Sequence, residues 1–196
     1  MKILVLGPHA NLLLPILDSS MVAESNDPID VQQLGEIGCD AIISFGYRYK
    51  ISDRVLEHLH GNAINFHISL LPWNRGSNPN FWSWLENTPK GVSAHWVSSD
   101  IDYGDLVSQA EVEFGQDETL RSSYDKLMNT ATSLVSDFWT NHGFENVPRR
   151  PQPEGGSTHK QSDFNVYSHI LNLGNDTLCS KITDFGKQNG LWLLKN

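Results

Sequence analysis

Three short apolar runs, separated by stretches with the pattern of amphipathic helices, constrain the fold of this chain more than any other feature. The runs cover residues 2–6, 41–45 and 63–68. Continuous apolar runs of this length are typical of strands buried on both faces of a parallel sheet. Because the runs alternate with helical stretches, they indicate parallel βαβ units. We therefore predict an α/β fold in which helices flank a mostly parallel sheet.

Local signals indicate where the connecting helices begin and end. The apolar stretch at residues 12–17 follows the first strand and is expected to be helical. Asp27-Pro28 has the pattern of an N-cap followed by proline at the first helical position, and Gly38 would end that helix. Ser52 is expected to cap a further helix, with Gly61 as its stop.

The pattern changes after Pro72, and from residue 146 the chain becomes rich in proline and glycine, as in loops. We expect a main domain at residues 1–145, followed at residues 146–196 by an extended arm and a small helical appendage. The elements expected after Pro72 are an aromatic helix from Asn78-Pro79, strands at 92–97 and 106–114, and helices at 118–141, 163–173 and 176–187.

Two polar residues on the third apolar run, Asn65 and His67, need a reason to be there. Strand side chains alternate between faces, so these two point to the same side. In open α/β sheets the carboxyl ends of strands are where ligands bind. Asp102 follows in an acidic turn. Each residue alone is more often structural, because buried polar groups are usually hydrogen-bonded and turn aspartates bond their own backbone.

Together the three residues match the needs of acyl transfer to an amine. Such a reaction requires a donor to the carbonyl oxygen, a group that manages the proton of the amine, and a group that orients it. The amide of Asn65, the imidazole of His67 and the carboxylate of Asp102 suit these roles in that order. This chemistry needs no nucleophilic serine or cysteine.

The surrounding motifs closely resemble those of the folate-dependent formyltransferases over roughly residues 1 to 140. The resemblance rests on Asn65-Phe66-His67-Ile68-Ser69-Leu70-Leu71-Pro72, Arg75-Gly76, the strand at Gly91, and Asp102-Tyr103-Gly104-Asp105. It implies a truncated Rossmann-like formyltransferase fold, a catalytic domain at residues 1–145, and 10-formyltetrahydrofolate as formyl donor without a metal. Asn65, His67 and Asp102 would be the catalytic trio. Ile68 departs from the family, which commonly has proline there.

The same resemblance implies a set of folate-binding loops. The pterin would lie between the turn after the second strand, the loop after His67 and the loop before Asp102. For Tyr49 and Ile51, ordinary packing at a helix start is the alternative. The expected folate contacts are Arg48, Tyr49, Lys50 and Ile51; Ser69, Leu70, Leu71 and Pro72; and Ser98, Ser99, Asp100 and Ile101.

The identity of the acceptor amine is less constrained. The turn Gly7-Pro8 lacks an amide donor at proline, which weakens a phosphate cradle like that of the purine-pathway enzymes. A net charge of −9 argues against tRNA or any other nucleic acid. The relatives that remain formylate nucleotide-linked amino sugars, for polysaccharide biosynthesis, or a carrier-bound aminoacyl group at the start of nonribosomal peptide synthesis. We predict the amino sugar; a non-catalytic folate-binding module is a third reading.

Several residues near these motifs could contact the acceptor. Arg75 suits a phosphate because its guanidinium is a planar fork. Hydrogen bonds that anchor loops are an equally good explanation. The candidates are His9, Trp73, Arg75, Asn78 and His159.

The composition indicates a cytoplasmic protein. No apolar run approaches the ~18 residues that a membrane span needs. Cys39 and Cys179 match neither a metal-ligand spacing nor a disulfide framework, as is usual in a reducing compartment. The apolar run at residues 191–194 has to be buried, either back on the domain or across a homodimer interface.

Overall fold

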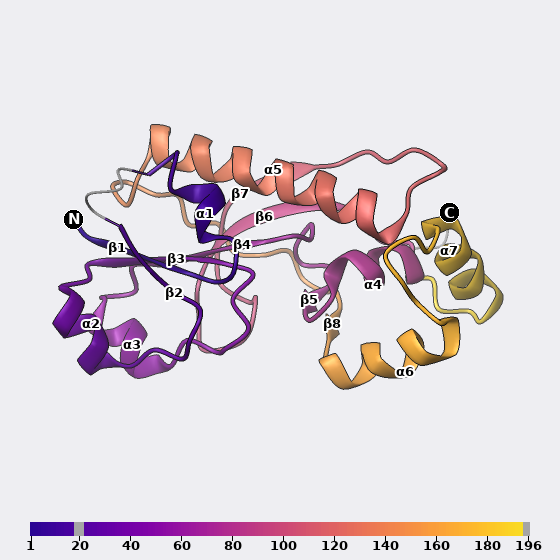
Figure 1. The fold of residues 1–196 in the computed structure, drawn as a ribbon, viewed down its shortest axis with the longest axis horizontal. Helices are drawn as coiled ribbons and strands as arrows, with labels where there is room; N and C mark the ends of the chain where they lie inside the picture. Colours follow the sequence, from indigo (N-terminus) through magenta and orange to yellow (C-terminus); the bar gives the residue numbers. More distant parts are fainter. Residues whose placement is uncertain (18–21, 194–196) are drawn as a thin grey trace. The chain divides into compact units, whose positions relative to one another are not determined.

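The computed structural model describes residues 1–17 and 22–193, and the chain forms two compact units (Figure 1). Unit 1 contains Met1–His67, Ser93–Gln109 and Ala131–Gln152. Unit 2 contains Ile68–Val92, Ala110–Thr130 and the described residues from Pro153 onward. The functional boundary expected at residue 145 stays a prediction, because compactness does not by itself delimit a catalytic domain.

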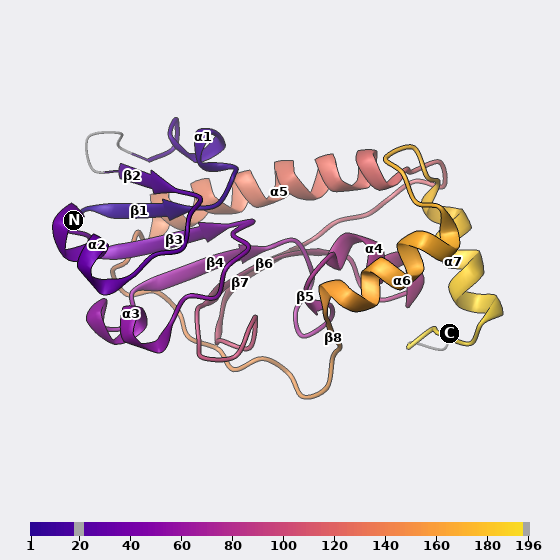
Figure 2. The ribbon, with the colours of Figure 1, turned by 60° about the horizontal axis from the view of Figure 1, so that its bottom comes forward.

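A six-stranded sheet organises unit 1, with the strand order β2-β1-β3-β4-β6-β7 (Figure 2). β1 is parallel to β2 and β3, β3 is parallel to β4, and β6 is antiparallel to β4. The predicted α/β fold with a mostly parallel sheet is therefore confirmed. The strands are β1 (Ile3–Leu6), β2 (Val22–Ser25), β3 (Ala41–Phe45), β4 (Ala63–His67), β6 (Gly91–Trp96) and β7 (Leu106–Glu111).

Helices cover both faces of this sheet within unit 1 (Figure 1). On one face α2 (Val31–Ile37) and α3 (Asp53–His58) pack on a core that includes Leu4, Ile42 and Val55. On the other face lie α1 (Ala10–Leu13) and the end of α5 (Leu120–Asn141), where Phe138 contacts Phe66 edge to face. The sheet is thus the middle of three layers.

Three parts of unit 1 differ from what the sequence pattern indicates. The helix expected at residues 12–17 is shorter and earlier, since α1 ends at Leu13 and residues 14–16 form turns. β2 was not predicted, because this strand at the edge of the sheet has no apolar run. The helix expected from Asp27-Pro28 begins instead at Val31, where Asp30 and Gln33 form a capping box. By contrast, Gly38 and Ser52 end and cap their helices as predicted.

Unit 2 is mainly helical. Its two-stranded sheet pairs β5 (Arg75–Gly76) in parallel with β8 (Thr158–His159), a strand in the segment expected to be an arm. Phe81, Trp82, Leu85, Leu171 and Ile182 form its apolar core. Its helices are α4 (Pro79–Leu85), the first half of α5, α6 (Gln161–Leu171) and α7 (Cys179–Gln188).

The apolar C-terminal run contributes to unit 2. Leu191 packs against its core, and Trp192 is half-buried and donates from Nε1 to the carbonyl of Thr183 at 3.3 Å. Leu194 lies outside the described residues. Burial on the protein itself therefore accounts for part of the run, and a homodimer stays a prediction. None of the described helices is long and apolar enough to span a bilayer.

Helices α4 and α7 approach closely at Gly186. A Cβ at this position would lie 1.9 Å from the carbonyl oxygen of Leu85, whereas a Cβ at Gly35 of α2 would meet nothing within 4 Å. We expect Gly186→Ala to lower the free energy of unfolding by about 1–3 kcal/mol, because the helices must separate. Gly35→Ala should raise it by about 0.5–1 kcal/mol through helix propensity. Urea unfolding followed by circular dichroism checks both, and an unchanged Gly186→Ala protein would contradict the close approach.

Lys90 is a largely buried cation in unit 2. Its Nζ donates to the carbonyl of Thr88 at 3.1 Å and lies 4.4 Å from the ring centroid of Trp84. Burial lowers the pKa of Lys90 to about 8. Between that value and the ordinary pKa near 10.5, the unfolded chain binds a proton that the folded protein has lost.

The stability contributed by neutral Lys90 should therefore rise with pH across this window. We expect the free energy of unfolding of the wild type, relative to Lys90→Met, to increase by on the order of 2 kcal/mol from pH 8 to pH 10. Cys179, whose pKa burial raises to about 11, is present in both proteins, so its titration largely cancels in the difference. Urea titrations at several pH values measure the effect. A difference that does not vary with pH would show that Lys90 is solvated.

Candidate active site

The three residues singled out in the sequence meet around one carboxylate in unit 1. Nδ1 of His67 lies 3.5 Å from Oδ2 of Asp102, and Nδ2 of Asn65 donates to Oδ1 of Asp102 at 3.2 Å. The side chains of His67 and Asp102 are each 9% exposed. An amide, an imidazole and a carboxylate thus form a nearly buried polar cluster at the carboxyl end of β4.

Strand geometry and a tight turn explain how the cluster forms. Asn65 and His67 share one face of β4, as their spacing predicts. Asp102 lies in the turn after β6 with φ of 61°, a left-handed conformation that aspartate tolerates better than most residues. Gly104 lets the turn pass close to β6, because a Cβ there would lie 1.7 Å from the carbonyl oxygen of Trp96.

A fourth member of the cluster, His95, was not predicted. It pairs with Asn65 in the β4–β6 register and is 1% exposed. Its Nδ1 lies 2.8 Å from the carbonyl oxygen of Trp96, while its Nε2 lies 3.2 Å from Nδ2 of Asn65 and 3.3 Å from Oδ1 of Asp102. A signal was available, since Ser93 and His95 alternate along a buried strand as Asn65 and His67 do.

The contacts of His95 define what it can do. A carbonyl only accepts, so the hydrogen of Nδ1 is committed to Trp96. Nε2 then accepts from Asn65 when the ring is neutral, and donates to Asp102 when the ring is protonated. In either state His95 holds the amide and the carboxylate of the cluster in place.

Large apolar side chains are exposed on the two residues that flank Asp102 in the chain. Ile101 and Tyr103, on either side of Asp102, are 56% and 51% exposed, and Tyr49 is also exposed. Large apolar side chains beside a buried polar cluster are typical of a ligand site. Ile51 is different, because it is buried in the core, as the packing alternative expects. Arg48 and Lys50 are exposed, and Ser98 donates from Oγ to the carbonyl of Asp100.

The loop after His67 belongs to unit 2. Ser69 is buried there and donates from Oγ to the carbonyl of Trp73 at 2.8 Å, and Leu71 is also buried. Leu70 and Pro72 lie in the same loop of that unit. The folate contacts expected of this loop stay predictions.

The candidate acceptor contacts make bonds that anchor loops. In unit 2, buried Arg75 donates to the carbonyl of Gly155 at 3.2 Å, and Asn78 donates to Oε1 of Gln161 at 2.9 Å. His159 stacks on Trp82 with ring centroids 3.9 Å apart and lies 3.1 Å from a carboxylate oxygen of Glu86. In unit 1, burial lowers the pKa of His9, whose ring lies against Phe45. Their acceptor role stays a prediction.

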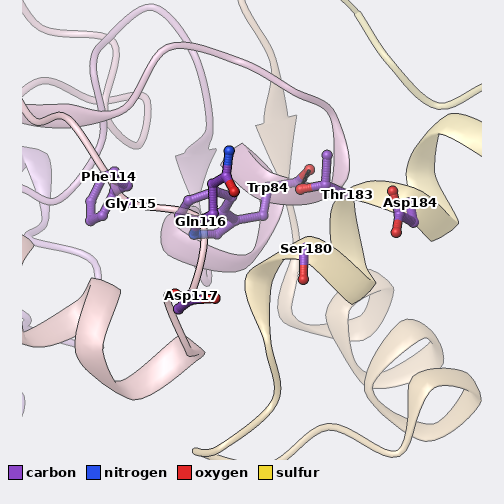
Figure 3. Close-up of a pocket in the computed structure, with 8 residues that line it drawn as sticks. All are labelled: Trp84, Phe114, Gly115, Gln116, Asp117, Ser180, Thr183 and Asp184. Atoms are coloured by element: carbon purple, nitrogen blue, oxygen red, sulfur yellow. Dashed lines mark hydrogen bonds between the residues drawn. The ribbon is translucent and has the colours of Figure 1, made fainter.

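Unit 2 also has an open hollow of about 510 Å³ that contains none of these residues (Figure 3). Trp84 and Phe114 form its aromatic wall, with ring centroids 5.3 Å apart. Its lining includes neither an imidazole nor a thiol, so we assign no chemistry to it. The residues that line it are Trp84, Phe114, Gly115, Gln116, Asp117, Ser180, Thr183 and Asp184. Across residues 1–17 and 22–193, no group of three or more His, Cys, Asp and Glu side chains could hold a metal ion.

Comparison with known proteins identifies relatives of the whole chain. The family model described as formyl transferase matches residues 19–137. The chain is 39% identical to the formyltransferase PseJ from Anoxybacillus kamchatkensis, solved in complex with UDP-4,6-dideoxy-4-formamido-L-AltNAc and tetrahydrofolate. That match covers 95% of this chain and 100% of the other, with a TM-score of 0.88.

More distant structures share the fold. A 4-N formyltransferase from Francisella tularensis is 21% identical, with 94% of this chain and 85% of the other covered and a TM-score of 0.74. Phosphoribosylglycinamide formyltransferase from Bacillus halodurans is 18% identical, with 72% and 96% covered and a TM-score of 0.61.

Proposed function

This chain belongs to the formyl transferase family, and from that premise we propose that it moves a formyl group from 10-formyltetrahydrofolate to the amine of a nucleotide-linked aminodeoxy sugar. The meeting of Asn65, His67 and Asp102 in one buried cluster carries the proposal of catalysis. The Anoxybacillus relative, bound to a UDP-linked formamido sugar and tetrahydrofolate, supports the proposed acceptor and donor.

The residues of unit 1 fit a folate donor. Ile101 and Tyr103 expose apolar surface on both sides of Asp102, which suits a flat pterin ring beside the polar cluster. We assign the folate to the turn at residues 48–51 and to the loop at residues 98–101. Exposed Arg48 and Lys50 would complement the negative charge of its glutamate.

Each member of the cluster has a distinct chemical task. The donor supplies an electrophilic formyl carbon. One amide hydrogen of Asn65 would turn from its partner in the cluster to the formyl oxygen and stabilise the negative charge that develops there. Asp102 orients the imidazole of His67. With a water molecule as relay, the pair would take the proton released by the attacking amine and pass it to the folate nitrogen, whose bond to the formyl carbon breaks. His95 keeps Asn65 and Asp102 aligned during this transfer.

A substrate panel tests the proposed acceptor. The protein is incubated with 10-formyltetrahydrofolate and UDP- or dTDP-linked 3-amino and 4-amino sugars, with an aminoacyl carrier protein in parallel. We expect formylation of a nucleotide-linked amino sugar, detected by mass spectrometry of the product. Formylation of the carrier alone would show a function in peptide synthesis. Folate binding without turnover on any amine would indicate a binding module.

Substitutions in the cluster test the catalytic assignment. We expect Asn65→Ala, His67→Ala and Asp102→Ala each to lower kcat by at least ~100-fold, because each removes a group that acts on developing charge or on the proton. His58→Ala, an exposed histidine of α3, is the matched control and should keep full activity. Circular dichroism verifies that the variants are folded. Near-normal rates in any two cluster variants would overturn the mechanism.

A further inference from the structure

The side chain of Gln152 is bound to the turn that carries Asp102. Its Nε2 lies 2.8 Å from the carbonyl oxygen of Asp102 and 2.8 Å from that of Gly104. An amide NH₂ has two hydrogens, so one group can donate to both carbonyls. We propose that Gln152 is a positioning residue for the formyl transfer, which holds the backbone of the Asp102 turn so that the carboxylate stays against His67.

The turn depends on such bonds. Asp102 has a left-handed backbone, and Gly104 lies against the carbonyl of Trp96. Ile101 and Tyr103 are more than half exposed, so apolar packing contributes little to holding the turn. Two hydrogen bonds from one side chain can therefore decide between alternative turn conformations.

Gln152 is itself presented by a rigid segment of unit 1. Arg150 and Leu106 exchange backbone hydrogen bonds of 2.7 and 3.0 Å. Trp96 donates from Nε1 to the carbonyl of Pro148 at 3.0 Å, and the Arg149 guanidinium lies 3.7 Å from the Trp96 ring centroid. Pro151 and Pro153 on either side of Gln152 restrict the backbone further. Little conformational entropy remains to be lost when the amide binds the turn.

Gln152 would affect catalysis only indirectly. Gln152 acts through the backbone of Asp102, and no reacting atom is assigned to it. A looser turn would change the 3.5 Å approach of Asp102 to His67 and so the transfer of the proton. Turnover should then fall, while binding of the acceptor is largely kept.

Gln152→Leu is the first test, because it removes both hydrogen bonds at similar volume. We expect kcat to fall by about 10–100-fold with KM for the acceptor within about 3-fold. Gln32→Leu is the matched control, since Gln32 makes one exposed bond to Glu36 on α2; its kcat should not change. An unchanged kcat in Gln152→Leu, or a loss confined to KM, overturns the proposal.

Gln152→Glu adds a readout that a merely structural role would not move. The introduced carboxylate would face two carbonyl oxygens and repel them, whereas its protonated form can donate to one. The titratable and charged groups of the turn are Asp102, Tyr103 and Asp105, with His67 and His95 against Asp102. Those of the segment that carries residue 152 are Arg149, Arg150 and Glu154. We expect the kcat of Gln152→Glu relative to wild type to rise as the pH falls from about 8 to about 6, because facing carbonyls favour the protonated acid. A ratio of kcat values that is independent of pH would contradict the proposed role of Gln152 in holding the Asp102 turn.

The proposal rests on the proposed function. Two measurements distinguish a failure of the positioning role of Gln152 from a failure of the proposed function. In an Asp102→Ala background, Gln152→Leu should cause no further loss of kcat, whereas an additive loss would overturn action through Asp102. Hydrogen exchange of residues 98–106 needs no turnover and should accelerate in Gln152→Leu. If the wild type formylates no acceptor but exchange accelerates, only the function fails. If hydrogen exchange of residues 98–106 is unchanged in Gln152→Leu, the proposed role of Gln152 is overturned.

Discussion

The site depends on the contacts that the carboxylate of Asp102 makes with Asn65, His67 and His95. A buried carboxylate is costly unless several donors surround it. Here Asn65 donates to one oxygen, His67 lies beside the other, and His95 lies beside the first. The three partners come from two antiparallel strands, so the sheet register itself decides whether the charge is paired. Removing the carboxylate would leave two histidines and an amide without their common partner.

The backbone of Asp102 requires as much support as its side chain. The turn combines a left-handed aspartate with a glycine packed against the preceding strand. Such a conformation persists only where the surroundings hold it. The segment at residues 148–152 supplies that support through a backbone pair, a cation–π contact and the amide of Gln152. A stretch that the sequence predicts to be part of an extended arm thus packs on the turn that carries Asp102.

The donor and acceptor sides of the proposed reaction differ in what supports them. Exposed apolar residues beside Asp102 suit a pterin, and they belong to the same unit as the proposed catalytic cluster. The acceptor candidates Arg75, Asn78 and His159 instead make hydrogen bonds within unit 2. Their bonds order the loops of that unit, and a sugar nucleotide would have to compete with or extend them. The relative bound to a UDP-linked formamido sugar is the stronger support for the acceptor.

The sequence by itself determined the layered α/β fold, because apolar periodicity and helix caps are local signals. It also determined that Asn65 and His67 share a face, because alternation is a property of one strand. β2 at the sheet edge has no apolar run and was missed. Asp30 and His95 do carry local signals, a capping box with Gln33 and the alternation with Ser93, but these signals were not recognised.

Only the tertiary structure decided that His95 and Gln152 act on the same carboxylate turn as Asn65 and His67. These contacts join residues up to 50 positions apart, and no pattern along the chain encodes the distance between two side chains that far apart.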